Sequence, residues 1–215
     1  APADIELPLW KLQVESWDAG DKVEITEDRG LGYVTREIYY DTNKTMLDAG
    51  EVKLKPWKDI PAVGPEVSGV GFYSAEFELP ETWNEHNLAV FQMDSVCGST
   101  AAVYVNGVKA PAVDFARPEV DITALVKPGK NEIKVEVTST LANRLQARGY
   151  FRDIPKMMGI IMSDPTVFGE MPGSDDEKPE DAPEGPGFPM TFETEPVNYG
   201  LTGGARIATY TLKEI

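Results

Sequence analysis

Apolar and polar residues alternate with a period of two along much of this chain, and the period of an amphipathic helix is nearly absent. The clearest example is residues 132–138, where Ile133, Val135 and Val137 share one face and charged residues or threonine occupy the other. Alternation of this kind is typical of a strand with one buried face. The same pattern predicts further strands over residues 11–16, 33–40, 75–79, 88–93, 103–105 and 206–212.

Turn residues separate these strands. Asn106-Gly107 follows a short strand and predicts a two-residue hairpin, because both residues tolerate a positive φ. Pro128-Gly129 fits a type II turn, and Asp121 is placed to cap one short helical turn. Many short strands with frequent turns indicate an all-β fold, an antiparallel β-sandwich of jelly-roll type.

Residues 173–187 follow neither pattern. They carry six acidic residues, one lysine, three prolines and a single apolar side chain, Ala182. Such a segment cannot bury enough surface to offset the entropy of ordering, so we expect a mobile acidic surface loop. Residues 188–215 should then return to the sheet as closing strands. We therefore expect a single β-sandwich domain over residues 1–215, a size that is common for one such domain.

Composition excludes several classes of function. The formal net charge is -16 and the sequence pI is about 4.4, so the surface should repel nucleic acid and anionic membranes. No apolar run approaches the roughly 20 residues of a membrane span. Cys97 is the single cysteine, so an intramolecular disulfide is excluded.

Several short motifs occur in a fixed order along the chain. They are WKLQVESW at 10–17, LKPWKDIP at 54–61, SGVGFYSAEFELP at 68–80, VYVNG at 103–107, VDIT at 120–123, KPGKN at 127–131 and YGLTGG at 199–204. Together they resemble the glycoside hydrolase family 2 sugar-binding-like, or galactose-binding-like, jelly-roll domain. The form found in large α-L-rhamnosidase-like multidomain glycoside hydrolases is the most similar. Two features depart from that pattern: Gly203-Gly204, where similar domains often have Gly-Pro, and the long acidic segment before it.

The resemblance implies a jelly-roll fold and a place in polysaccharide breakdown. It also implies an extracellular or cell-surface, bacterial-type location, although the chain begins Ala-Pro and shows no signal peptide. Sugar binding does not follow from it, because such domains also serve as spacers or as packing partners of a catalytic domain.

Catalytic motifs are absent from the sequence. Glycoside hydrolysis needs two carboxyl groups at a set separation, and no pair among the 36 acidic residues stands in a recognisable catalytic context. A catalytic barrel of about 250 residues would not fit in this length. His86, the only histidine, lies in a polar turn, and Gly-x-Ser-x-Gly does not occur. We expect the isolated chain not to be an enzyme.

Sugar binding uses aromatic rings that stack on the apolar faces of sugars and polar side chains that bond their hydroxyls. The loop-like context of five residues makes them candidates: Trp57, Trp83, Asn143, Arg144 and Tyr150. The competing interpretation of each tryptophan is a core plug or loop anchor. For Arg144 it is an ion pair that fastens the loop.

No cofactor is expected. The acids permit a structural Ca²⁺, with Asp175 and Asp176 as the densest pair, but no Asp-x-Asp-x-Asp-Gly loop is present and no ligand set is assigned. With one histidine and one cysteine, zinc is disfavoured.

The sequence therefore predicts a non-catalytic carbohydrate-binding or accessory module of an extracellular glycoside-hydrolase-like protein. Its partner would be a glycan or the catalytic domain of the same polypeptide. A purely structural spacer would instead expose an unusually large apolar patch. A standalone glycosidase would show a cleft with two close carboxyl groups, one with a raised pKa.

Overall fold

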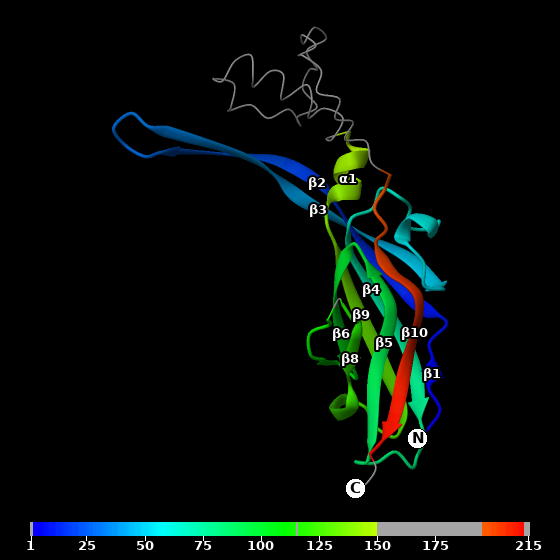
Figure 1. The fold of residues 1–215 in the computed structure, drawn as a ribbon. Helices are drawn as coiled ribbons and strands as arrows, with labels where there is room; N and C mark the ends of the chain where they lie inside the picture. Colours follow the sequence, from blue (N-terminus) through cyan, green and yellow to red (C-terminus); the bar gives the residue numbers. More distant parts are fainter. Residues whose placement is uncertain (1, 115, 150–194, 213–215) are drawn as a thin grey trace.

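Two stacked antiparallel sheets form the molecule (Figure 1), and the computed structural model describes residues 2–114, 116–149 and 195–212. One sheet has the strand order β1-β10-β5-β8 and the other the order β3-β2-β4-β9-β6-β7. This confirms the predicted all-β sandwich. The elements are β1 (Ile5–Glu6), β2 (Trp10–Asp28), β3 (Val34–Val52), η1 (Trp57–Asp59), β4 (Gly69–Leu79), β5 (Asn87–Cys97), β6 (Ser99–Val105), β7 (Val108–Lys109), β8 (Glu119–Asp121), η2 (Thr123–Leu125), β9 (Gly129–Ser139), α1 (Ala142–Ala147) and β10 (Gly200–Thr211).

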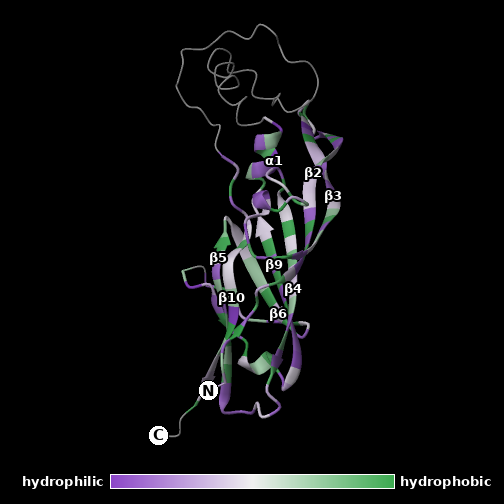
Figure 2. Cartoon of the chain, turned by 90° about the vertical axis from the view of Figure 1, so that its right-hand side faces the viewer, coloured by the Kyte–Doolittle hydropathy of each residue, from purple (hydrophilic) through white to green (hydrophobic). Residues whose placement is uncertain are grey.

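A row of buried side chains crosses the six-stranded sheet on its inner face. Tyr73 on β4 lies opposite Leu12 on β2 and Val135 on β9, and Val135 lies opposite Val103 on β6. All four are 0–1% exposed. Figure 2 shows the underlying alternation of hydrophobic and hydrophilic positions along these strands. One face of each strand therefore packs in the core, and the other face points to solvent.

The second sheet contributes the opposite half of the core. Phe91 on β5 lies opposite Ile207 on β10 and Val120 on β8, and Phe91 and Ile207 are fully buried. The two layers meet where the Trp10 and Phe91 rings approach to 6.1 Å between centroids. Contacts of this kind between aromatic rings stabilise a core beyond the area that they bury.

The predicted turns are confirmed. Asn106 and Gly107 have φ values of 52° and 82°, as a tight hairpin requires, and Gly129 has a φ of 74°. The carboxylate of Asp121 accepts a hydrogen bond from the backbone N–H of Thr123, where η2 begins. Local turn chemistry thus sets these connections as the sequence predicted.

The predicted strand lengths at the N-terminal end are wrong. Strands were expected over residues 11–16 and 33–40, but β2 and β3 each run for 19 residues and pair with one another as far as Asp28 and Val34. β2 pairs with β4 only over residues 11–16. Beyond that point the two strands leave the sandwich as a long two-stranded ribbon (Figure 1). The ribbon does not cover the core. Its residues therefore need not show the alternation of apolar and polar positions from which strands were predicted.

The two ends of the described chain meet at one end of the sandwich. β10 closes the four-stranded sheet between β5 and β1, which confirms the expected closing strand. The Thr209 hydroxyl donates to the Pro2 carbonyl at 2.6 Å, and the Thr209 N–H donates to the Asp4 carboxylate.

The acidic segment 173–187, with Asp175 and Asp176, lies outside the described residues, as does Tyr150. The described part of the sandwich shares one hydrophobic core cluster. A single domain over residues 1–215 stays a prediction.

Candidate functional site

Trp57 lies in the core, with 1% of its surface exposed. Its loop context is as expected, because η1 begins at this residue. The indole N–H, however, donates to the Tyr73 hydroxyl at 2.8 Å, and the ring lies 6.0 Å from that of Tyr199. Burial raises the pKa of Tyr73 to about 12, so its hydroxyl stays protonated. The indole therefore has no open face for a sugar, and it matches the alternative of a core plug.

Trp83 and Asn143 are also turned away from solvent. Trp83 is 9% exposed and belongs to the core cluster. Asn143 is 4% exposed, and its side-chain amide exchanges two hydrogen bonds with the backbone of Val197. The Trp83 ring therefore packs in the core, and the Asn143 side chain holds α1 to the backbone at Val197.

Arg144 connects the helix α1 to β2. Its guanidinium donates to the Ser16 hydroxyl at 3.1 Å and lies 3.6 Å from the Asp18 carboxylate, which Arg148 also contacts at 2.9 Å. Partial burial raises the pKa of Asp18, but the N–H of Ala19 and the two guanidinium groups outweigh it and lower that pKa. The arrangement matches the ion-pair alternative.

Arg144 also lines a hollow of about 420 Å³ beside the ribbon. Among the described residues, its buried Nε has no hydrogen-bond partner. Glycan binding at Arg144 stays a prediction.

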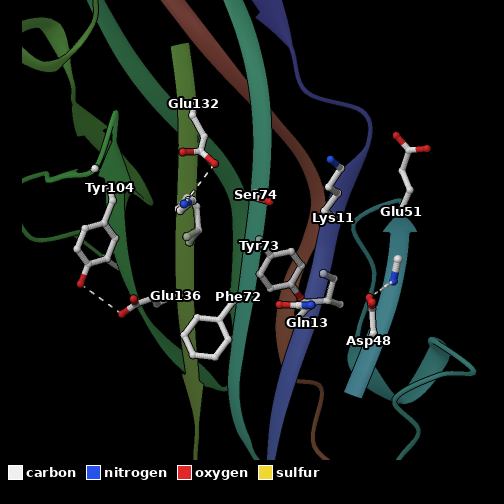
Figure 3. A pocket seen from close by; sticks show the side chains of 15 residues that line it. Lys11, Gln13, Asp48, Glu51, Phe72, Tyr73, Ser74, Tyr104, Glu132 and Glu136 are labelled. Carbon is white, nitrogen blue, oxygen red and sulfur yellow. Dashed lines mark hydrogen bonds and ion pairs between the residues drawn. The ribbon is translucent and has the colours of Figure 1, made fainter. Parts of the chain in front are cut away.

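A larger hollow, about 820 Å³, lies on the outward face of the six-stranded sheet. Figure 3 shows side chains from β2, β4, β6 and β9 directed into it. The strand register places them in two rows. One row runs Asp48, Gln13, Phe72, Glu136 and Ala102, and the next runs Glu51, Lys11, Ser74, Lys134 and Tyr104.

Two rings and one small side chain shape this sheet groove. Phe72 and Tyr104 stand in adjacent rows on strands that flank β9. Ser74 adds little volume beside Phe72, and Glu136 on β9 lies between the two rings (Figure 3). Aromatic faces beside an open floor fit the apolar face of a sugar ring.

Carboxylates surround the rings. The Tyr104 hydroxyl donates to Glu136 at 3.3 Å, and Lys134 pairs with Glu132 at 3.3 Å. Desolvation and the negative charge of Glu136 raise the pKa of Tyr104. Two lysines oppose four carboxylates among the lining residues, a balance that suits a neutral or cationic ligand. Among the described residues, no group of three or more His, Cys, Asp or Glu could hold a metal ion.

Sequence reasoning missed Phe72 and Tyr104 because it searched loops for binding aromatics. The available signal was their position on a strand. Phe72 falls on the outward face of β4, one residue from the buried Tyr73, and Tyr104 falls between the buried Val103 and Val105. An aromatic residue on the solvent face of an alternating strand marks a ring that is only partly buried, as Phe72 and Tyr104 are.

No family model matches this chain, and no curated protein matches it. Among solved structures, the chain is similar to a rhamnosidase from Novosphingobium sp. PP1Y, with a TM-score of 0.51 and 19% identity. The match covers 98% of this chain and 15% of the rhamnosidase. A β-D-glucuronidase from Dictyoglomus thermophilum gives a TM-score of 0.39 at 20% identity, over 64% of this chain and 20% of that chain. A β-glucuronidase from Ruminococcus gnavus gives 0.39 at 18%, over 64% and 21%.

The rhamnosidase match shows a shared fold. This chain spans 15% of the length of that protein. Within the described residues, no helix has the length and hydropathy to cross a membrane.

Proposed function

We propose that this chain is a non-catalytic accessory module of a larger extracellular glycoside-hydrolase-like protein, and that it binds glycan in the sheet groove. Two observations support an accessory role: the fold is shared with a rhamnosidase, and it accounts for 15% of that protein. The motifs of the sugar-binding-like domain family point the same way. A neutral sugar polymer also suits a chain with a net charge of -16.

The observation that carries glycan binding is the pair of rings in the groove. Phe72 and Tyr104 offer apolar faces, while Gln13, Glu136 and Lys134 place polar groups around them. A sugar needs both kinds of contact, because its rings have apolar faces and its hydroxyls need hydrogen-bond partners.

Catalysis is not part of the proposal. A glycosidase requires a carboxylic acid whose pKa is raised so that it can donate a proton. The pKa values of Glu15 and Glu24 are lowered, chiefly by hydrogen bonds from Trp17 and Arg36, so neither of these two carboxyl groups meets that requirement. These groups stay ionised and serve as ion-pair partners.

The test is a glycan array that includes rhamnose and galactose glycans, with added Ca²⁺ and again with a chelator. Phe72→Ala and Tyr104→Ala should weaken retention about two- to twelvefold each, the loss expected for an aromatic contact of about 0.5–1.5 kcal/mol. Tyr210→Ala is the matched control, because Tyr210 is an exposed ring on the other sheet.

Arg144→Ala separates the groove from the second candidate site. Weaker retention in this variant, with Phe72→Ala and Tyr104→Ala unchanged, would move the site to the hollow beside α1. A blank array from a folded sample would overturn glycan binding altogether. The remaining role would be packing against a catalytic domain, which the exposed apolar residues of the ribbon favour.

A further inference from the structure

The outer part of the β2–β3 ribbon, residues 20–42, is here called the arm. β2 loses its second neighbour after Ser16, where its pairing with β4 ends. From Lys22 to Asp28, β3 is its only partner among the described residues. Figure 1 shows the arm reaching away from the sandwich. A solitary two-stranded hairpin is marginally stable in water, so a long one needs other contacts to hold its shape.

Exposed apolar side chains concentrate on the arm. Of the 14 exposed large hydrophobic residues in the described chain, seven fall between positions 25 and 40. An apolar patch of this density on an otherwise acidic protein marks an interaction surface. The seven are Ile25, Leu31, Tyr33, Val34, Ile38, Tyr39 and Tyr40.

Apolar residues lie on both faces of the arm, among charged ones. The register pairs Val23 with Tyr39 and Ile25 with Glu37, so Val23, Ile25 and Tyr39 share one face. Ile38 and Tyr40 lie on the opposite face, together with Val34. A ribbon that rested on a flat surface would need one apolar face only. Two such faces fit insertion between two walls.

The tip of the arm presents a leucine at an unfavourable backbone angle. Leu31 has a φ of 53° and is 100% exposed, between Gly30 and Gly32 at 80° and 81°. The turn is held by the Gly30 N–H on the Asp28 carboxylate and by the Arg29 N–H on the Tyr33 carbonyl. A non-glycine residue at positive φ is uncommon. Within the described chain, nothing contacts the side chain to offset it.

Charge argues against a second copy as the partner. Between positions 21 and 41 the arm carries six acidic residues and three basic ones, a net charge of -3, on a chain of -16. Two arms would therefore repel one another, whereas a basic surface would attract an arm. The acidic residues are Asp21, Glu24, Glu27, Asp28, Glu37 and Asp41, and the basic residues are Lys22, Arg29 and Arg36.

We propose that the arm inserts into a cleft of another folded domain of the same polypeptide. Leu31 enters an apolar pocket there, both faces of the ribbon contact apolar walls, and basic side chains around the cleft face the acidic residues. This inference rests on the proposed accessory role, because it supplies the contact that fastens the module to its larger protein.

The test is hydrogen exchange of residues 22–40 in two samples: this chain alone, and the full polypeptide encoded by its gene. The arm amides should exchange at least tenfold more slowly in the full polypeptide, because docking blocks local opening. In the full polypeptide, Leu31→Asp should remove that protection and Leu31→Met should keep it. Val108→Asp, at the exposed hairpin strand β7, is the control and should change nothing.

Equal exchange of the arm in the two samples would overturn the inference, and so would a gene that encodes no further domain. Arm protection that rises with concentration in the isolated chain, together with a dimer in sedimentation, would assign the arm to a second copy and also overturn it. Glycan retention is measured on the same variants. Retention without arm protection contradicts the docking alone, and arm protection with a blank array contradicts glycan binding alone.

Discussion

Gly200, the first residue of β10, packs against the buried ring of Trp57. Its φ is 101°, and a Cβ added to it would lie 2.6 Å from atoms of the Trp57 ring and from the Tyr73 hydroxyl. The neighbouring Leu201 N–H donates to that same hydroxyl at 3.2 Å. A single residue therefore combines a backbone angle that favours glycine with a space that admits no side chain.

Gly200→Ala should destabilise the fold by about 2–4 kcal/mol, adding overpacking of about 1–3 kcal/mol to the strain at positive φ. Urea unfolding measures the change. Gly107→Ala is the matched control, because Gly107 has a φ of 82° and nothing within 4 Å of an added Cβ. Equal losses in the two variants would show that the close packing around Trp57 contributes nothing.

The direction in which a side chain points was the feature least predictable from the sequence. The proline before Trp57 correctly indicated a loop, but loop membership does not determine whether a ring points inward. That depends on Tyr73 and Tyr199, which are distant in sequence and contact the indole only after the strands have assembled.

At the scale of elements, α1 is fastened to β2 by charge. Asp18 is contacted by Arg144 and Arg148 from the helix. Asn143 and Arg144 were expected in a loop-like context, and a six-residue helix has too few turns to show a period. A helix this short is unstable alone, and its ion pairs to β2 stabilise it.

This anchoring should depend on pH. The pKa of Asp18 is lowered in the folded protein below its ordinary value of 3.8, so its contribution is present above that value. The contribution disappears as pH falls through the lower, folded-state pKa. The difference in free energy of unfolding between the native protein and Asp18→Asn should therefore be clear near neutral pH and vanish in strong acid. Urea titrations across that range measure it, and a constant difference would contradict the ion-pair role.

The strands of the sandwich were predictable and the arm was not. Residues 132–138 alternate because one side of their strand must be buried. Along the arm both faces are open, and apolar residues occur on each. The alternation of apolar and polar residues therefore does not show where β2 and β3 end.

At the scale of the whole molecule, the sandwich followed from many short alternating segments and strong turn signals, each of which is local. The sheet groove did not, because it is built by the register of five strands. Phe72 and Tyr104 come from strands that are adjacent only through β9. Such a site becomes visible once strand order is known.

Pro2 and Thr209 are in contact, so the order of the strands along the chain can be changed without changing their order in the sheets. A circular permutant that joins Leu212 to Pro2 through a short linker, and opens at Gly30, would keep every strand pairing of both sheets. We expect it to unfold cooperatively in urea with a native far-ultraviolet spectrum, because closing a short loop between adjacent ends adds little entropy cost. A permutant without a cooperative transition would show that the tip connection of the arm is needed for the sandwich itself.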